Sequence, residues 1–311
     1  MGRGGNGAGR SGGIGERWGL VLAGDDATRL RPLTRQLTGD DRPKQFCPVM
    51  GGRTLIEETW RRISRVISAE HGMVVVTAHH EPYYTPLLAR LRPAHVVVQP
   101  ENRGTAAGIL YPMLRPWSLA PAATVAVLPS DHHFSDDMRF MARVEAAFDA
   151  VASCRERVVL LGMIPDTPES DYGWIEPGEP LTSASELSRV SRFWEKPPVE
   201  LAETLRARGC LWNSFVMVGA VETFLAAIAC ALPALYGALE NVVPEREAVE
   251  AVYGALPAAD FSSDVLTPGA ERLAVMPVPG VTWSDLGSPD RVLRVCRPPD
   301  ALELVGAGAA A

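Results

Sequence analysis

Short runs of aliphatic and β-branched residues recur along the first half of the chain, with helix-like segments between them. The runs lie at Trp18–Ala23, Gly72–Ala78, Ala94–Gln99, Ala123–Pro129 and Arg157–Met163. The segments Thr54–Ile67, Gly104–Leu114 and Asp137–Val151 carry apolar residues at helical spacing. Strands that are apolar throughout and alternate with helices are typical of a parallel sheet with both faces covered. The pattern predicts an α/β, Rossmann-like, doubly wound and predominantly parallel sheet, with ligands beyond the carboxyl ends of its strands.

The second half of the chain is less regular. Its short aromatic and glycine-bearing segments are DYGWIEPGEPL, VSRFWEKPP, LWNSFVMVG and VTWSDLGSPD. These segments predict strands and loops rather than further strand–helix repeats. We therefore expect a smaller, β-containing portion beside the main sheet.

Composition excludes several classes of protein. With 47 % hydrophobic residues among 311, the chain can bury a sizeable core. A net charge of −7 argues against nucleic acid as a partner, because non-specific binding needs a basic face. Five scattered cysteines without a CxxC pair indicate a reducing compartment. Since no long uninterrupted apolar run or signal-peptide pattern is present, we expect no membrane partner and a cytoplasmic location.

The two ends of the chain differ in composition from the rest. Residues 1–16 are rich in Gly and Arg, which predicts a disordered tail, and we expect a second tail over 297–311. GAGRSG at 7–12 matches the dinucleotide fingerprint formally, but no strand pattern precedes it and no helix pattern follows, so we reject it. One domain over 17–296 remains between the tails.

The first aliphatic run leads into a loop of mixed charge, GDDATRL at Gly24–Leu30. The loop does not match the GxxxxGK[ST] motif of nucleotide triphosphatases. A tight loop with many backbone N–H groups, followed by Arg29 and Lys44, can nevertheless hold a phosphate chain. A polar surface turn with a solvated arginine is the alternative.

Two aspartates are candidate metal ligands. Asp131 follows the run ending at Pro129, and a carboxylate at the tip of a buried strand commonly holds a divalent cation. A turn or a helix cap would explain it equally simply. The adjacent His132 and His133 suggest zinc, but three consecutive side chains do not readily point at one ion. Asp285 in TWSDLG is the second candidate, or an ordinary turn residue.

These segments combine into a family resemblance that extends from about Trp18 to about Val295. The matching segments are LAGDDATRLRPLTR, RPKQFCPVMGGRTLIEET, QPENRGTAAGI, VLPSDHHF, DYGWIEPG, VSRFWEKP, LWNSFVMV, FSSDVL and VTWSDLGS. In this order they resemble the sugar-1-phosphate nucleotidylyltransferases, and most closely the mannose-1-phosphate guanylyltransferases. No single segment would be sufficient alone.

The resemblance implies a nucleotide-diphospho-sugar transferase type of fold and an activity. A nucleotidyl group passes from a nucleoside triphosphate to a sugar-1-phosphate, and pyrophosphate leaves; GTP and mannose-1-phosphate, which give GDP-mannose, are the first choice of substrates. Mg²⁺ is the implied cofactor, and a homodimer is a candidate assembly. Residues 17–165 would form the nucleotide-binding half and 166–296 the sugar-phosphate-binding half.

The resemblance also assigns residues to each role. Catalytic roles fall on Arg29, Lys44, Asp131 and Lys196, and the metal on Asp131 and Asp285. Nucleotide-binding residues would be Leu22, Ala23, Gly24, Asp25, Asp26, Ala27, Thr28, Arg29, Lys44, Pro100, Asn102, Gly104 and Thr105. Sugar-phosphate-binding residues would be Asp131, Tyr172, Gly173, Glu176, Glu195, Lys196 and Asn213. On the sugar side a solvated Glu195–Lys196 ion pair and a turn at Asn213 are the alternatives, and Trp212 is expected in the core whatever the function.

The phosphate loop departs from the family pattern GGxGTRL. Asp25 stands where the second glycine is usual, and Ala27 where the last one is. Asp tolerates left-handed backbone angles, so we expect the loop shape to survive. Its charge beside a triphosphate needs a cation between them. The resemblance also implies that the sequence lacks the cupin-like isomerase domain of longer relatives. Alternatives are the same reaction with another nucleotide or sugar-1-phosphate, or a catalytically weak regulatory homologue that binds sugar nucleotides.

Overall fold

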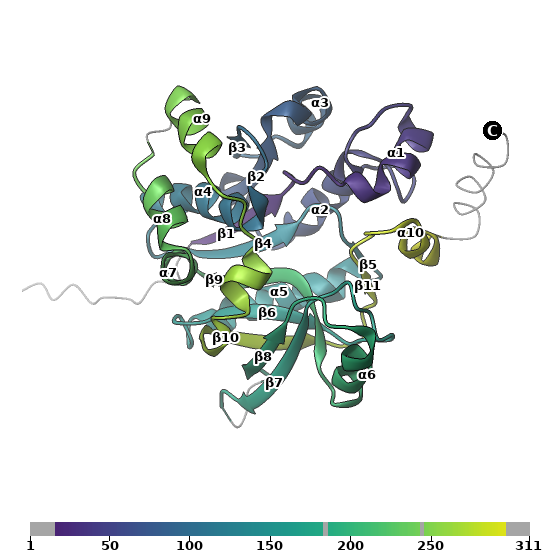
Figure 1. Ribbon diagram of the computed structural model, residues 1–311, viewed down its shortest axis with the longest axis vertical. Helices are drawn as coiled ribbons and strands as arrows, with labels where there is room; N and C mark the ends of the chain where they lie inside the picture. The colour runs from purple at the N-terminus through teal and green to yellow at the C-terminus, as the bar shows by residue number, and fades with distance from the viewer. Residues whose placement is uncertain (1–15, 183–185, 243–245, 297–311) are drawn as a thin grey trace, which may run out of the picture.

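A single large sheet crosses the molecule, with helices packed on both faces (Figure 1). The computed structural model describes residues 16–182, 186–242 and 246–296. The expected tails lie outside these residues except for Glu16.

The strands of the structure are short. Their bounds are β1 Arg17–Leu22, β2 Gly72–Thr77, β3 His95–Gln99, β4 Thr124–Pro129, β5 His133–Phe134, β6 Val158–Met163, β7 Trp174–Pro180, β8 Ser188–Trp194, β9 Leu211–Ala220, β10 Leu273–Val278 and β11 Trp283–Ser284. The α-helices are α1 Arg31–Thr38, α2 Leu55–Ile63, α3 Glu81–Leu91, α4 Gly104–Leu119, α5 Asp137–Val151, α6 Val199–Ala207, α7 Val221–Ala231, α8 Pro233–Leu239, α9 Arg246–Ala255 and α10 Pro289–Val295.

The main sheet has nine strands in the order β3-β2-β1-β4-β9-β6-β10-β8-β7. Strands β1 to β4 are parallel, and so are β6 and β10. This confirms the predicted doubly wound α/β fold. The second half adds antiparallel strands: β9 lies between β4 and β6, and β7 and β8 form the far edge. Their direction was not predicted, because a strand's apolar pattern does not encode the direction of its neighbours.

Alternation along each strand explains why both faces are covered. In β1, Trp18 and Leu20 point into the core beneath α4 and α7, while Val21 points into the core beneath α2 and α5. In β2, Val75 points into the core beneath α4 and α7, and Val76 into the core beneath α2 and α5. Successive side chains of a strand face opposite sides, so two apolar cores form from one continuous apolar run.

Two predicted helices differ in length from the observed ones. The segment starting at Thr54 is helical only to Ile63; the reciprocal capping of Thr54 and Glu57 fixes its start. The helix expected over 104–114 continues to Leu119 and contains Pro112 and Pro116. Both prolines are buried in this helix, whose apolar packing offsets the backbone hydrogen bonds that they remove.

A two-residue ribbon positions the candidate metal residues. Strand β5 pairs with β11 antiparallel, with Phe134 opposite Trp283. Asp131 lies two residues before β5, and Asp285 directly follows β11. The ribbon therefore brings together two aspartates that are distant in the sequence.

Candidate active site

The loop after β1 is held closely by neighbouring side chains. Thr77 at the end of β2 donates a hydrogen bond to the Gly24 carbonyl at 2.8 Å, and Gln45 Nε2 donates to the Asp25 carbonyl at 2.7 Å. A Cβ added at Gly24 would lie 2.8 Å from Gln99 Nε2. Only glycine fits this approach without moving a buried glutamine, so Gly24 fixes the course of the loop.

The strained position of this loop is Ala27. Its φ of 47° lies in the left-handed region, whereas Asp25 is not among the residues with positive φ. The expectation that Asp25 uses its tolerance of left-handed angles is therefore wrong. The left-handed residue of this loop is instead an alanine, and that backbone conformation costs an alanine about 1–2 kcal/mol.

Lys44 joins the two candidate metal aspartates. Its Nζ lies 3.3 Å from Asp131 Oδ2, and the two side chains are only 10 % and 13 % exposed. The same ammonium donates to the Asp285 carbonyl at 2.5 Å and to the Leu286 carbonyl at 3.2 Å. Lys44 begins the short turn Lys44–Phe46, whose next residue, Gln45, contacts the phosphate loop at the Asp25 carbonyl. The donors of Lys44 are thus directed at the loops after β4 and β11.

The Asp285 carboxylate is held in an ionic network that sequence reasoning did not find. Arg291 Nη1 donates to its Oδ1 at 3.0 Å and to its Oδ2 at 3.1 Å, and Tyr172 donates at 3.2 Å. Burial opposes ionisation of this carboxyl, but Lys44 and Arg291 outweigh it and lower its pKa below the usual value. Asp285 is therefore ionised near neutral pH. Arg291 lies in the C-terminal helix α10, and no sequence motif marked it.

Asp25 lies in the same electrostatic environment, although its side chain is open to solvent. Partial removal of the Asp25 carboxyl from water raises its pKa, and repulsion by the Asp131 carboxylate raises it further. Lys44 lowers it by attraction, but the net result is a raised pKa. The charges of Asp131 and Lys44 therefore both act on the Asp25 carboxyl.

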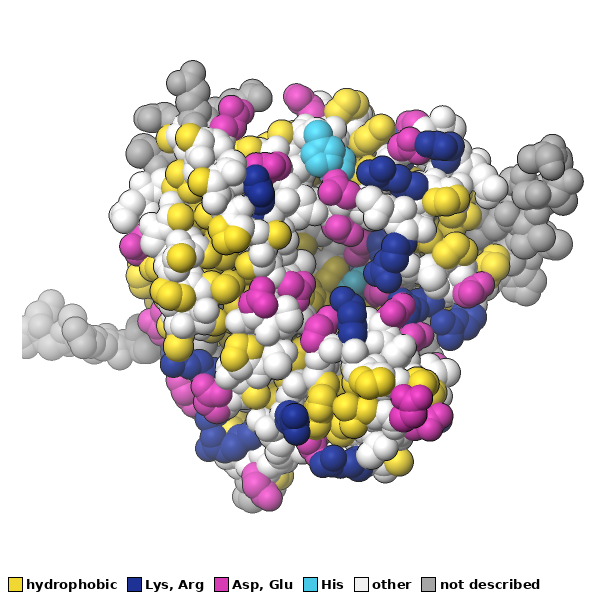
Figure 2. All heavy atoms as spheres, in the orientation of Figure 1, with side chains coloured by type: hydrophobic (Ala, Val, Ile, Leu, Met, Phe, Trp, Pro, Cys, Tyr) yellow, Lys and Arg dark blue, Asp and Glu magenta, His cyan; other side chains and the backbone are white. Residues whose placement is uncertain are grey.

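Arg29 lies at the open side of the loop. Its side chain is 66 % exposed and contacts Asp171 Oδ2 at 3.8 Å. Asp171 in turn accepts a hydrogen bond from Arg291 at 2.8 Å. Thr28, which precedes Arg29, is also exposed. Figure 2 shows a hollow near the centre of this face, with basic and acidic side chains around its rim.

The segment from Pro100 to Thr105 is tied to a stretch near the C-terminus. Thr105 Oγ1 donates to Asp260 Oδ2 at 3.0 Å and accepts from the Phe261 backbone N–H at 2.7 Å. Asn102 Oδ1 accepts from the Gly104 N–H at 2.9 Å. Residues at the start of FSSDVL therefore hold the stretch that contains the predicted nucleotide-binding residues Pro100 to Thr105, a contact between distant segments that the sequence did not indicate.

Several sugar-side candidates gather around Gly173. A Cβ there would lie 3.0 Å from Glu195 Oε2 and 3.3 Å from the Asn213 Cβ. The Asn213 N–H donates to the Gly173 carbonyl at 2.8 Å. Lys196 is 57 % exposed and pairs with Glu195 at 3.3 Å. Glu176 is set apart from them by an ion pair with Arg208, and Trp212 is buried as expected.

A separate cluster, also missed, lies beside the phosphate loop. Asp26 Oδ1 is 2.7 Å from His79 Nε2 and 3.1 Å from His80 Nε2. The histidines belong to the short turn Ala78–His80 after β2. Burial lowers the pKa of His80 to about 4, so its ring is neutral near pH 7. Among the described residues these three donors could hold a metal, whereas Asp131, His132 and His133 do not form such a group.

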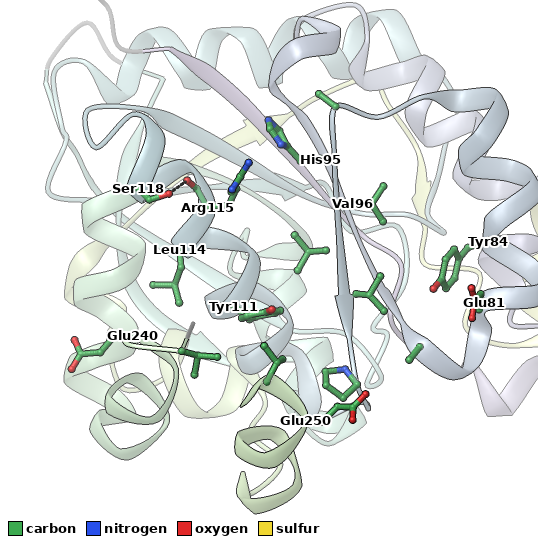
Figure 3. A pocket seen from close by; sticks show the side chains of 17 residues that line it. Glu81, Tyr84, His95, Val96, Tyr111, Leu114, Arg115, Ser118, Glu240 and Glu250 are labelled. Carbon is green, nitrogen blue, oxygen red and sulfur yellow. Dashed lines mark hydrogen bonds between the residues drawn. The ribbon is translucent and has the colours of Figure 1, made fainter. Parts of the chain in front are cut away.

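A pocket of about 840 Å³ lies away from these aspartates. It opens between β3 and α4, with His95 and Val96 on one side and Tyr111 and Arg115 on the other (Figure 3). Of the predicted nucleotide-binding residues only Pro100 lines it. The charged groups suited to phosphate chemistry lie instead around Lys44.

Comparison with known proteins identifies the family. The Nucleotidyl transferase family model matches residues 18–297. The chain belongs to the nucleotidyl transferase family. Among its curated relatives, the xanthan biosynthesis protein XanB of Xanthomonas campestris pv. campestris strain B100 is 29 % identical over 89 % of this chain and 58 % of its own length. The mannose-1-phosphate guanylyltransferase of Escherichia coli K12 is 28 % identical over 86 % of this chain and 57 % of its own length.

A solved structure agrees with this assignment. It is a Thermus thermophilus protein named a mannose-1-phosphate geranyltransferase, with a TM-score of 0.77 and 30 % identity over 88 % of this chain and 76 % of that one. The present chain spans about half the length of the curated relatives that it matches. Within the described residues, no helix is both long enough and apolar enough to cross a bilayer.

Proposed function

We propose that the chain transfers a nucleotidyl group from a nucleoside triphosphate to a sugar-1-phosphate and releases pyrophosphate, with GTP and mannose-1-phosphate as its substrates. The observation that carries the proposal is the contact of Lys44 with Asp131 and with the backbone at Asp285, next to Gln45, which binds the loop that begins at Gly24. The similarity to proteins named mannose-1-phosphate guanylyltransferase supports the choice of substrates.

The chemistry requires charge neutralisation rather than a protein nucleophile. An oxygen of the sugar-1-phosphate attacks the α-phosphorus and forms a new P–O bond, while the bond from that phosphorus to pyrophosphate breaks. Negative charge gathers on the transferred group, so positioned cations and N–H groups lower the barrier. Exposed Arg29 is available to the phosphates, and Lys44 fixes Asp131 at the floor of the cleft.

The two aspartates fit a hard divalent cation. Asp131 and Asp285 are 13 % and 19 % exposed, and both offer carboxylate oxygens within reach of the cleft. Mg²⁺ is usually held by one or two carboxylates together with water and substrate phosphates. We therefore assign Mg²⁺ to Asp131 and Asp285. When bound, the ion supplies charge neutralisation and orientation of the phosphates.

The remaining residues divide between two substrates. Residues 17–165, with the loop from Leu22 to Arg29 and the Pro100–Thr105 stretch, would bind the nucleotide. Residues 166–296 would bind the sugar phosphate, with Tyr172, Gly173, Glu195, Lys196 and Asn213 nearest to it. Because Arg208 already neutralises Glu176, we expect Glu176 to contribute least to sugar binding.

Pyrophosphate release with Mg²⁺, measured across a panel of nucleoside triphosphates and sugar-1-phosphates, tests the proposal. We expect the highest kcat/KM with GTP and mannose-1-phosphate. Release only with another pair, such as dTTP and glucose-1-phosphate, would overturn the substrates and retain the reaction. Ligand binding without release from any pair would overturn the reaction and favour a regulatory sugar-nucleotide-binding role.

A further inference from the structure

Three potential metal ligands from two loops meet at the side of the phosphate loop. Asp26 comes from the loop after β1, and His79 and His80 from the turn after β2. The two Nε2 atoms lie 2.7 Å and 3.1 Å from the same oxygen of Asp26, and one donor atom from each residue lies within 4.8 Å of the other two. The proposed transfer reaction makes no use of either histidine.

The spacing and the ligand types suit a transition metal. Zinc bonds to imidazole nitrogen and carboxylate oxygen are about 2.0–2.2 Å long, so ligand atoms around a tetrahedral ion are roughly 3.3 Å apart. The observed separations at Asp26 are slightly shorter, and small side-chain rotations open them to that value. Two imidazoles with one carboxylate favour the Zn²⁺ class over Mg²⁺ or Ca²⁺, which prefer oxygen ligands.

One ligand is fixed and the other two are accessible. The His80 side chain is 4 % exposed, and its ring meets the edge of Phe46 at 5.9 Å between centroids. His79 is 55 % exposed and Asp26 32 %, which leaves a path for an ion and a position for a fourth ligand such as water. Among the described residues, no lysine or arginine forms an ion pair with Asp26, so the carboxylate keeps charge to offer a cation.

We propose that Asp26, His79 and His80 bind a divalent transition-metal ion of the Zn²⁺ class, at a site separate from Asp131 and Asp285. The ion links the phosphate loop to the end of β2, because its ligands come from both. Coordinate bonds replace the His79 hydrogen bond and the His80 contact, which share one carboxylate oxygen of Asp26. Metal binding therefore restrains the loop that carries Asp25 and the left-handed Ala27.

Cobalt binding to untagged protein tests the site, because Co²⁺ occupies zinc sites and its visible absorption reports nitrogen ligands. We expect one equivalent of nitrogen-ligated Co²⁺, identified by its visible absorption and displaced by Zn²⁺; any Co²⁺ held by Asp131 and Asp285 would have oxygen ligands and is distinguished by its spectrum. The variants His79→Ala and Asp26→Asn should bind at least about tenfold more weakly, since even outer-shell changes alter metal affinity by about 10–100-fold. Both side chains are partly or well exposed, so neither substitution removes core packing.

A matched control is His71→Ala. His71 Nε2 lies 3.3 Å from Glu16 Oε2, and within the described part of the chain this histidine–carboxylate pair belongs to no group of three possible metal ligands. Its removal should leave cobalt binding unchanged. Asp131→Asn should also retain the cobalt spectrum, so loss of nucleotidyl transfer and loss of this metal site give different results.

Two outcomes would overturn the proposal. The first is that wild-type protein binds no stoichiometric Co²⁺ or Zn²⁺. The second is that His79→Ala and Asp26→Asn bind the ion as tightly as wild type. The link between loop and strand has its own measurement: Zn²⁺ should slow amide hydrogen exchange over residues 24–30 in wild type, and unchanged exchange would exclude that link.

Discussion

The Lys44 ammonium lies 3.3 Å from the Asp131 carboxylate, and the two side chains are almost completely removed from solvent. Removal of one partner leaves the other buried without its counter-charge. We expect Lys44→Met to lower the free energy of unfolding by about 3 kcal/mol and to abolish pyrophosphate release. Urea denaturation measures the first effect.

Arg35→Ala is the control for Lys44→Met. Arg35 pairs with Asp41 on the surface, and its side chain is 65 % exposed. Solvent screens an exposed pair and weakens its contribution to stability, so this variant should unfold nearly as wild type does. Equal losses in both variants would contradict a special role for the buried pair.

Asp131→Asn should retain the fold and lose turnover. The substitution keeps the size of the side chain but removes the charge expected to hold Mg²⁺, so kcat should fall at least about a hundredfold. Steady-state pyrophosphate release and circular dichroism check the two statements. Unchanged kcat at saturating Mg²⁺ would remove Asp131 from the proposed metal site.

Ala27→Gly should stabilise the protein. Glycine occupies a φ of 47° without the steric cost that alanine bears, although its greater freedom in the unfolded chain offsets part of the gain. We expect a net increase of about 0.5–1 kcal/mol in the free energy of unfolding.

The same substitution at Ala142 gives the opposite expectation. Ala142 is exposed within helix α5, where glycine is less favourable than alanine by about 1 kcal/mol. Denaturant unfolding of both variants separates relief of strain from a general effect of glycine. Destabilisation by both would show that the left-handed position of Ala27 carries little strain.

Asp25→Asn should change stability in a pH-dependent way. The pKa of Asp25 is raised in the folded protein, mainly because the surrounding protein partly removes the carboxyl from water, and next because Asp131 repels its charge. The folded state thus holds this proton more tightly than the unfolded state, and the contribution of Asp25 to stability falls as pH rises from the ordinary Asp value through the raised one. Asn does not titrate, so the variant should have a higher Tm than wild type at pH 7.

Thermal melts at a series of pH values check this expectation. The difference in Tm should shrink as pH falls and should vanish well below about pH 4, where Asp is protonated in both states. A lower Tm for the variant at pH 7 would contradict it and would indicate that Lys44 stabilises the ionised form of Asp25.

The sequence predicted the parallel half of the fold well, because its strands are apolar throughout and its helices lie between them. Helix α5 has the predicted bounds, Asp137–Val151. The placement of β9 between β4 and β6 was not predictable, since it depends on pairings between distant segments. Helix α4 was predicted to end at Leu114 but continues to Leu119, although prolines disfavour the interior of a helix.

The candidate site was predictable where a residue follows a strand. Gly24 follows β1 and Asp131 follows β4. Asp131 pairs with Lys44, and the charges of both act on Asp25, which is next to Gly24. Arg291 was missed because its role depends on where α10 packs. His79 and His80 were missed because their meeting with Asp26 depends on the register of β1 against β2.

The ribbon of β5 and β11 has a consequence for the order in which the site can be assembled. The phosphate loop and Lys44 are synthesised early, whereas Asp285 emerges only after all nine strands of the main sheet. Trp283 must then pair opposite Phe134 before the second aspartate reaches Lys44. A nascent chain that ends before β11 therefore contains every strand of the main sheet but only one of the two aspartates to which the proposed function assigns the metal.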